Sequence, residues 1–345
     1  MHFKTSIVNA KQVKEVKSLL SKPKNIVIVT HWSPDGDAMG SSLGLYNYLI
    51  QKNHKVTVIT PNDYPQFLFW MAGNNKVIDF SKKAAPAKKV VAAADIVFCL
   101  DFNSLKRIDK LGDEVAKSKA IKFIIDHHLQ PEDFAQYMLH DVKACSTCEL
   151  IYDFINLMGD KKLFNKDIAN CLYTGIMTDT GSFRFPSTTT KTHNIIADLI
   201  KFGAENAEVH NRIYDGNTVD KIKLLGFCLG EKLTVLKELN TAYFSLTEKE
   251  LLKYNYRKGD TEGVVNYALS IEGIKFAAFF VERDGVIKTS FRSKGSFNVN
   301  LFAREHFSGG GHANAAGGMS PLSMKDTLKK FVSLVPTYKK ELTKK

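Results

Sequence analysis

Cysteine is scarce in this sequence, and several long-range patterns are missing from it. The five cysteines are odd in number and scattered, so in a chain of 345 residues they do not form a disulfide framework. Cys145 and Cys148 form a single C-x-x-C without a second pair, which favours structural thiols over a zinc or redox site. No apolar run has the length that spans a bilayer, and there is no internal repeat or low-complexity tract. The sequence therefore excludes a disulfide-rich scaffold, a repeat protein and an integral membrane protein.

The N-terminal segment also lacks the apolar core of a signal peptide, so we expect a cytoplasmic protein. Hydrophobic residues make up 44% and charged residues 24% of the chain, as in an ordinary globular protein of one large domain or two domains. The net charge of +12 favours an anionic partner such as phosphate or nucleic acid. Paired lysines in polar and terminal stretches fit a solvated surface equally well, so the net charge supports an anionic partner only weakly.

Apolar runs that alternate with amphipathic segments indicate the fold. They predict strands over 26–30, 55–60, 95–100 and 121–125, and helices over 9–21, 43–50, 147–158, 168–178 and 192–202. This alternation is typical of a doubly wound parallel sheet. Residues 204–230 are helical without a strand, and strands follow over 234–239, 241–246, 274–281 and 286–292. We predict an α/β protein with a parallel, doubly wound N-terminal domain (1–203), a helical connector (204–230) and a smaller α/β domain with a mixed sheet (231–345).

The stretch NIVIVTHWSPDGDAMGSSLGL, from Asn25 to Leu45, organises the first domain. A buried strand ends at His31, and a Pro-Asp-Gly-Asp turn with small residues after it opens a helix. Open α/β sheets bind ligands at such strand-to-helix loops. The turn brings His31, Asp35 and Asp37 close together, a set suited to a hard cation. Taken alone, the same residues also fit a surface turn.

Two further predicted strands end in residues that bind metals. One ends at Asp101 and the other at Asp126, His127 and His128, while Asp179 follows a predicted helix. Parallel strands end at the same edge of a sheet, so these side chains can meet. Two histidines and four aspartates, His31, Asp35, Asp37, Asp101, His127 and Asp179, suit two divalent ions. Nitrogen and oxygen ligands without thiolate favour Mn²⁺, with Mg²⁺ and Co²⁺ as alternatives.

These motifs resemble those of the DHH phosphoesterase family. The chain contains H-x-x-P-D-G-D-A-x-G-S, a strand-terminal Asp, D-H-H, T-G-x-x-T-D-T-G-S-F and a late G-G-G-H-x-x-A-A-G, and the resemblance covers about residues 20–335. Within the family, the chain is most similar to bacterial oligoribonucleases that also act as pAp phosphatases. One departure is Ser308, where many relatives carry another glycine.

The resemblance implies a role for each of these residues. His31 and Asp35 are expected to hold one ion, Asp37, His127 and Asp179 the other, and Asp101 to bridge the two. His128 is expected to contact the scissile phosphate or the leaving oxygen. Asp126 is expected to orient a ligand imidazole, the alternative being a helix N-cap. Asp101, Asp126 and His128 thus form the expected catalytic set.

The second predicted domain carries groups that could bind the substrate. Arg292 and Ser293 end a predicted strand, and Gly309, Gly310 and Gly311 are expected to present bare N–H groups to an anion beside His312. Asn314 could reach a base or sugar. By itself this segment is more typical of a Gly-rich turn around a core histidine; the resemblance favours a site for the substrate's far phosphate. Arg184, just after Asp179, could also face the substrate, or it could form a surface ion pair.

The resemblance therefore implies a manganese-dependent phosphodiesterase that acts on short RNA of roughly two to five units, on linear dinucleotides such as pApA and on pAp. A cyclic dinucleotide phosphodiesterase, for example of cyclic di-AMP, is the first alternative. An inorganic pyrophosphatase or exopolyphosphatase and a non-catalytic nucleotide-binding protein are further ones. We also expect a homodimer, as in many relatives, and no membrane partner.

Overall fold

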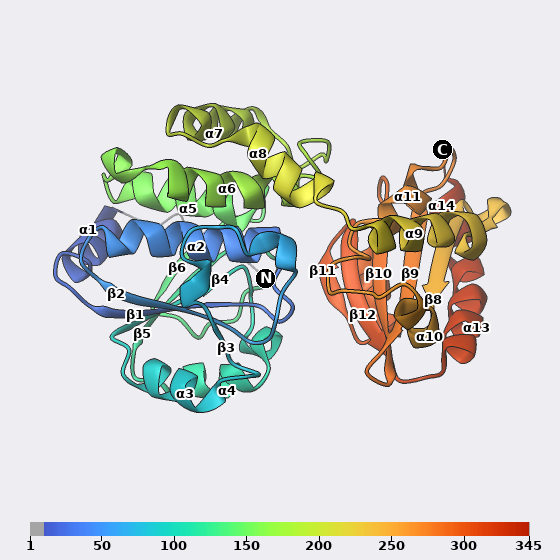
Figure 1. Ribbon diagram of the computed structural model, residues 1–345, viewed down its shortest axis with the longest axis horizontal. Coiled ribbons are helices and arrows are strands. Elements are labelled where there is room, and N and C mark those ends of the chain that lie inside the picture. Colours follow the sequence, from blue (N-terminus) through green and yellow to red (C-terminus); the bar gives the residue numbers. More distant parts are fainter. Residues whose placement is uncertain (1–9, 345) are drawn as a thin grey trace. The chain divides into compact units, whose positions relative to one another are not determined.

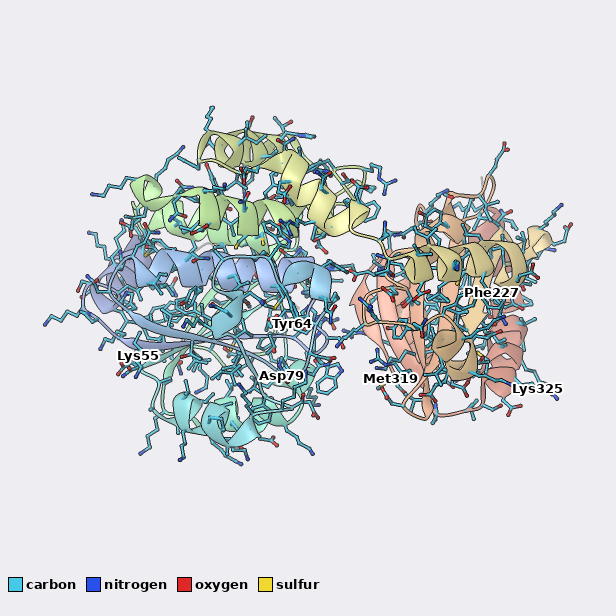
Figure 2. The ribbon with its side chains drawn as sticks, in the orientation of Figure 1. Lys55, Tyr64, Asp79, Phe227, Met319 and Lys325 are labelled. Carbon is cyan, nitrogen blue, oxygen red and sulfur yellow. The ribbon has the colours of Figure 1, made fainter. Side chains whose placement is uncertain are left out.

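The computed structural model describes residues 10–344. The chain divides into two compact units, Met1–Gly216 (unit 1) and Asn217–Lys345 (unit 2). Charged side chains such as Lys55 and Lys325 lie on the surfaces of these units (Figure 2). Within the described residues, no helix is both long enough and apolar enough to cross a membrane.

Unit 1 is built on a six-stranded sheet with the order β3-β2-β1-β4-β5-β6, in which every pair is parallel. Its strands are β1 (Asn25–Thr30), β2 (Lys55–Thr60), β3 (Ile78–Asp79), β4 (Ile96–Leu100), β5 (Ile121–Asp126) and β6 (Tyr137–His140). Its α-helices are α1 (Ala10–Leu19), α2 (Gly36–Ile50), α3 (Ala84–Ala92), α4 (Lys110–Lys117), α5 (Thr147–Leu157), α6 (Lys166–Asp179), α7 (Thr190–Lys201) and α8 (Asn206–His210).

Helices cover both faces of this sheet (Figure 1). Along β1, Ile26 and Ile28 pack in a core that includes residues of α2, α5 and α6, while Val27 and Val29 pack in a second core with α3 and α4. Because both faces are buried, β1 is apolar from Ile26 to Val29 and β4 is apolar at every position. The predicted parallel, doubly wound domain is confirmed.

Unit 2 contains a mixed six-stranded sheet with the order β11-β12-β10-β9-β8-β7, in which β8 and β9 are parallel and the other pairs antiparallel. The strands are β7 (Thr234–Leu236), β8 (Thr241–Leu246), β9 (Phe276–Arg283), β10 (Val286–Ser293), β11 (Gly310–His312) and β12 (Ala315–Ser320). The α-helices are α9 (Val219–Phe227), α10 (Glu248–Lys253), α11 (Val264–Ser270), α12 (Val299–His306), α13 (Met324–Leu334) and α14 (Lys339–Thr343). The predicted mixed sheet is confirmed.

The expected connector is helical, and its residues pack in both cores. Val209 and Ile213 belong to a core of unit 1, and Leu224 and Cys228 to a core of unit 2. The chain therefore passes from one unit to the other after Gly216, within the expected connector. The domain limits at 203 and 230 stay predictions.

Several elements differ from the sequence-based expectation. The helix α2 begins at Gly36, within the expected turn, because the Asp35 carboxylate accepts N–H groups from Asp37 and Ala38 and caps it. No strand was predicted in the Gly-rich segment, but it forms β11 and β12. The helices α3 and α4 and the strand β6 were not predicted. The start of the first predicted helix, residue 9, lies outside the described residues.

Candidate metal centre

The predicted metal ligands lie at one edge of the parallel sheet. The strands β1, β4 and β5 are neighbours, so their carboxyl ends lie side by side. His31 follows β1, Asp101 follows β4, and His127 follows the last residue of β5. All three residues are buried, with at most 7% of the surface of each exposed. The sheet thus brings together residues that are far apart in the sequence.

One donor group consists of His31, Asp35 and Asp101. Their ligand atoms all lie within 4.8 Å of one another. His31 Nε2 lies 3.4 Å from Asp101 Oδ2 and 3.9 Å from Asp35 Oδ1. Its Nδ1 contacts the carbonyl oxygen of Trp32 at 2.9 Å, which orients the ring so that Nε2 faces the carboxylates.

A second donor group consists of Asp37, His127 and Asp179. His127 Nε2 lies 3.8 Å from Asp37 Oδ2 and 3.5 Å from Asp179 Oδ2, while Nδ1 contacts the carbonyl oxygen of Ala144 at 3.1 Å. Asp101 adjoins this group as well, because its Oδ1 lies 3.5 Å from His127 Nε2. One Asp101 oxygen therefore faces each donor group, which is the geometry expected of a shared ligand.

The backbone of Asp101 has an uncommon conformation. Its φ of +63° lies in the left-handed region, which few residues other than glycine adopt and which aspartate tolerates better than most. The main-chain N–H of Asp101 donates to the carbonyl oxygen of Ile125 at 3.1 Å, so the residue stays attached to β5. Such strain is common at functional sites, where the surrounding structure holds it in place.

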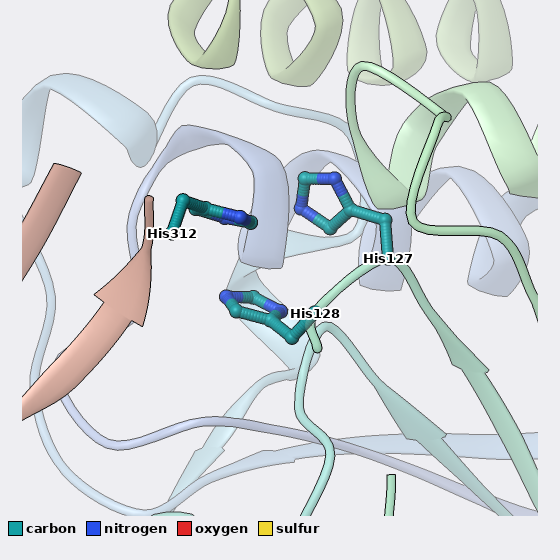
Figure 3. Close-up of side chains that lie close together, drawn as sticks. All are labelled: His127, His128 and His312. Atoms are coloured by element: carbon teal, nitrogen blue, oxygen red, sulfur yellow. The ribbon is translucent and has the colours of Figure 1, made fainter. Parts of the chain in front are cut away.

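His128 and Asp126 form a pair beside these groups. His128 Nδ1 lies 2.7 Å from Asp126 Oδ1, and Asp126 is completely buried. Figure 3 shows the imidazoles of His127 and His128 as separate neighbours. The imidazole that Asp126 orients is therefore that of His128, not that of the expected ligand His127. The alternative reading of Asp126 as an N-cap is wrong, because Asp126 ends β5 and the next described α-helix begins at Thr147.

The charges of the centre depend on one another. Burial works to lower the pKa of His31 and of His127, but hydrogen bonds to Asp101 and the charges of the surrounding aspartates together raise both pKa values. Burial also works against a charge on Asp101, yet these two histidines hold its pKa well below its usual range. For Asp37, burial and the charges of Asp101 and Asp179 raise the pKa well above its usual range.

The His128–Asp126 pair differs from the two donor groups. Burial lowers the pKa of His128, and the neighbouring Asp126 only partly offsets this. Burial works against a charge on Asp126, but the charge and hydrogen bond of His128 hold its pKa below the usual value. Within residues 10–344, Asp126 Oδ2 has no hydrogen-bond partner.

This donor set fits a pair of divalent cations. Several carboxylates crowd into a buried space, where their mutual repulsion is strong unless positive charge is added. Protonation of His31 and His127 supplies part of that charge. Two cations, each facing imidazole and carboxylate donors, would neutralise the carboxylates and leave the histidines neutral.

One residue at the centre was missed by sequence reasoning. The Thr147 hydroxyl donates to Asp101 Oδ1 at 2.9 Å, and the main-chain N–H groups of Thr147 and Cys148 donate to Asp37 at 2.6 and 2.9 Å. The sequence shows only a helix start here, with Ser146 as the N-cap, and the structure confirms that cap. No local pattern indicates that this helix begins at the metal centre.

Arg184 lies in a turn just after Asp179. Gly181, Ser182 and Phe183 have consecutive positive φ values of 56°, 60° and 66°, which turn the chain away from α6. Arg184 Nε donates to the carbonyl oxygen of Gly181 at 2.6 Å. Its role at the substrate stays a prediction.

The expected substrate residues of unit 2 lie on β10, on β11 and in the turn before β12. Asn314 Nδ2 donates to Ser293 Oγ at 2.9 Å, so these two side chains contact each other. The expectation of bare N–H groups is wrong at two positions. The N–H of Gly309 donates to the carbonyl oxygen of Ala303, and that of Gly311 donates to Asn300 Oδ1 at 3.0 Å. The roles of Arg292, Ser293, Gly310, Gly311, His312 and Asn314 stay predictions.

A parallel α/β sheet that ends in a cluster of histidines and aspartates defines a class of metal-dependent hydrolases. Comparison with known families is more specific. Residues 25–176 match the DHH family, N-terminal domain, and residues 240–339 match the DHHA1 domain. The chain belongs to the DHH family and is a phosphoesterase.

Individual relatives agree with this assignment. The chain is 30% identical over 306 residues to the bifunctional oligoribonuclease and PAP phosphatase NrnA of Bacillus subtilis, covering 88% of this chain and 91% of that protein. It is 26% identical to the cyclic-di-AMP phosphodiesterase GdpP of the same organism, where the match covers 94% of this chain and 49% of that protein. A crystal structure of an exopolyphosphatase-related protein from Bacteroides fragilis superposes with a TM-score of 0.92 at 40% identity, covering 98% of this chain and all of that one.

Proposed function

We propose that this chain is a manganese-dependent phosphodiesterase that hydrolyses short oligoribonucleotides, including linear dinucleotides such as pApA, to mononucleotides. We propose that it also removes the 3′-phosphate of pAp. The observation that supports this most directly is the placement of Asp101 between two donor groups, each with a histidine and at least one further carboxylate. The full-length similarity to a relative named for both activities supports the substrate class.

Each donor group is proposed to hold one ion. His31 and Asp35 would bind the first, Asp37, His127 and Asp179 the second, and Asp101 both. Two such ions lower the pKa of water and neutralise charge on a phosphate undergoing substitution. The absence of thiolate donors favours Mn²⁺, Mg²⁺ or Co²⁺.

His128 is proposed to contact the substrate directly. Because Nδ1 of His128 faces Asp126, Nε2 is the ring nitrogen through which His128 would reach a phosphate or leaving oxygen. Asp126 fixes the orientation of the ring and would hold the proton on Nδ1.

The substrate is proposed to carry a second anionic group that unit 2 binds. Arg292 is suited to forked hydrogen bonds with a phosphate, and His312 adds a further donor. Ser293, Gly310, Gly311 and Asn314 complete this proposed subsite, and Arg184 of unit 1 is proposed to bind near the metal centre. We also propose a cytoplasmic homodimer.

A cyclic dinucleotide phosphodiesterase is the second candidate, since a relative of that name matches 94% of this chain. The metal centre would serve both reactions equally, so only the substrate distinguishes them.

Initial rates on a panel of substrates test the proposal. The panel contains pApA, longer oligoadenylates, pAp, cyclic di-AMP, pyrophosphate and polyphosphate, each with Mn²⁺ and with EDTA. We expect pApA and pAp to be hydrolysed only with metal, and the rate to fall as the oligonucleotide lengthens. The Asp101→Asn variant, purified in parallel, controls for contaminating nucleases. Turnover of pyrophosphate or polyphosphate alone would refute the proposal, and a preference for cyclic di-AMP would favour the second candidate.

A further inference from the structure

The N-terminus of α5 contacts two carboxylates that come from different elements. Asp37 lies in the first turn of α2, and Asp101 follows β4. Asp37 Oδ2 accepts the main-chain N–H of Thr147 at 2.6 Å, and Asp37 Oδ1 accepts that of Cys148 at 2.9 Å. The hydroxyl of Thr147 donates to Asp101 Oδ1 at 2.9 Å. One residue, Thr147, therefore holds both carboxylates.

The start of α5 gives each oxygen of Asp37 one main-chain donor, the N–H of Thr147 for Oδ2 and the N–H of Cys148 for Oδ1. The N-terminal end of a helix also stabilises negative charge. The start of α5 thus fixes the position of the Asp37 carboxylate through two hydrogen bonds at the positive end of the helix.

The Thr147 hydroxyl is not needed to cap the helix. Ser146 is the N-cap, and its Oγ accepts the N–H of Glu149 at 3.1 Å. Thr147 is completely buried, so its hydroxyl cannot turn to bulk water. The described hydrogen bond of this hydroxyl is the one to Asp101, the residue whose backbone is held in the left-handed region.

We propose that Thr147 is a positioning residue of the metal centre. Its N–H and hydroxyl fix Asp37 and Asp101 relative to each other, so that the two donor groups are preorganised for ions. This inference rests on the proposed metal centre but not on the identity of the phosphoester. Hydrogen-bond partners of ligand residues typically contribute 10–100-fold to metal affinity, and we expect Thr147 to fall in this range.

The test compares hydroxyl-free and hydroxyl-bearing variants of the full chain. Thr147→Val has nearly the same shape without the hydroxyl, and Thr147→Ser restores it. Binding of Mn²⁺ to the metal-free protein is measured by electron paramagnetic resonance of the unbound ion. We expect Thr147→Val to bind at least about 10-fold more weakly, and Thr147→Ser to stay within about 3-fold of wild type.

Thr174→Val is the matched control. Thr174 is also completely buried in unit 1, but its hydroxyl donates to the carbonyl oxygen of Asn170 at 2.8 Å within α6. We expect this variant to bind Mn²⁺ like wild type. Wild-type affinity in Thr147→Val, or an equal loss in Thr147→Ser, would overturn the inference.

Folding and activity are followed separately. The melting temperature in EDTA measures the stability of the fold without metal. If Thr147→Val melts at a lower temperature than wild type, Thr147→Ala provides a smaller side chain without a hydroxyl. We expect the same loss of Mn²⁺ affinity in that variant. Saturating Mn²⁺ is expected to restore most of the kcat of Thr147→Val, because the ions and substrate contacts are intact. If the wild-type protein binds no Mn²⁺, both this inference and the proposed function are wrong. If the wild-type protein binds Mn²⁺ and Thr147→Val binds it equally well, only the inference is wrong.

Discussion

Gly175→Ala is a sharp test of how tightly the metal centre is packed. Gly175 lies within α6, and its Cα faces the start of α2 and of α5. A Cβ added there would lie 2.8 Å from Asp37 Oδ1 and 3.0 Å from Asp37 Cα, and closer still to Cys148 Sγ. Real Cβ atoms do not approach other atoms so closely. The substitution therefore forces Asp37 and Cys148 to move.

Two opposing effects decide the size of the loss. Alanine is favoured over glycine within a helix by roughly 0.5–1 kcal/mol. Overpacking a buried site typically costs about 1–3 kcal/mol. We expect a net loss of about 1–2 kcal/mol, which lowers the melting temperature of a unit of this size by roughly 2–8 °C. Because Asp37 moves, we also expect Mn²⁺ to bind about 10–100-fold more weakly.

Calorimetry in EDTA and Mn²⁺ titration measure the two effects. In the double variant Cys148→Ala/Gly175→Ala the clash with sulfur is removed while the contact with Asp37 remains, so stability should recover more than metal affinity. Gly226→Ala on α9 is the matched control, because a Cβ at Gly226 meets nothing within 4 Å. Wild-type melting and wild-type Mn²⁺ affinity in Gly175→Ala would refute the reasoning.

Three further predictions follow from the site and its surroundings. Asparagine tolerates the left-handed backbone of Asp101, but Asp101→Asn loses the charge that both donor groups face. We expect its Mn²⁺-dependent rate to fall at least about 100-fold while the protein still folds in EDTA. A rate near wild type would contradict the shared role of Asp101. Mn²⁺ at 100 times its dissociation constant should stabilise the protein by about 2.7 kcal/mol and raise its melting temperature by several degrees, and the absence of any shift would contradict ion binding by the folded state. Hydrogen bonds from Lys161 and Tyr152 lower the pKa of Asp198 to about 2, below its unfolded value, so its contribution is present above pH 4 and is lost as the pH falls toward 2. Urea unfolding should therefore give Asp198→Asn a free energy of unfolding that is lower than that of wild type by less than about 1 kcal/mol at pH 6. The two proteins should be equally stable near pH 2. A difference that persists at pH 2 would contradict this assignment.

The parallel sheet and the donor residues could be predicted because their signals are local. Strands that are buried on both faces appear as apolar runs, and β1, β4 and β5 contain such runs at 26–29, 96–100 and 123–125. A polar residue directly after such a run lies at the edge of the sheet. This reasoning placed His31, Asp101 and His127 correctly at one edge, although it could not specify which oxygen faces which imidazole.

Other features depend on contacts that the sequence does not display. Glycine weakens strand propensity, so β11 and β12 were not recognised, although their pairing with β10 makes them strands. A Pro-Asp-Gly signal suggested a turn where α2 begins, because Asp35 serves as a cap as well as a donor. The role of Thr147 depends on where α5 packs, and its neighbours in the sequence contain no sign of Asp37 or Asp101.

The order of the donors along the chain has a consequence for synthesis. The chain grows from its N-terminus, and Asp179, at the end of α6, is the last donor of the second group to be made. A nascent chain that stops before α6 lacks both this carboxylate and the glycine against which Asp37 packs. Binding of an ion at the proposed second position therefore requires synthesis to pass α6, and released fragments that end before this helix are expected not to bind an ion there.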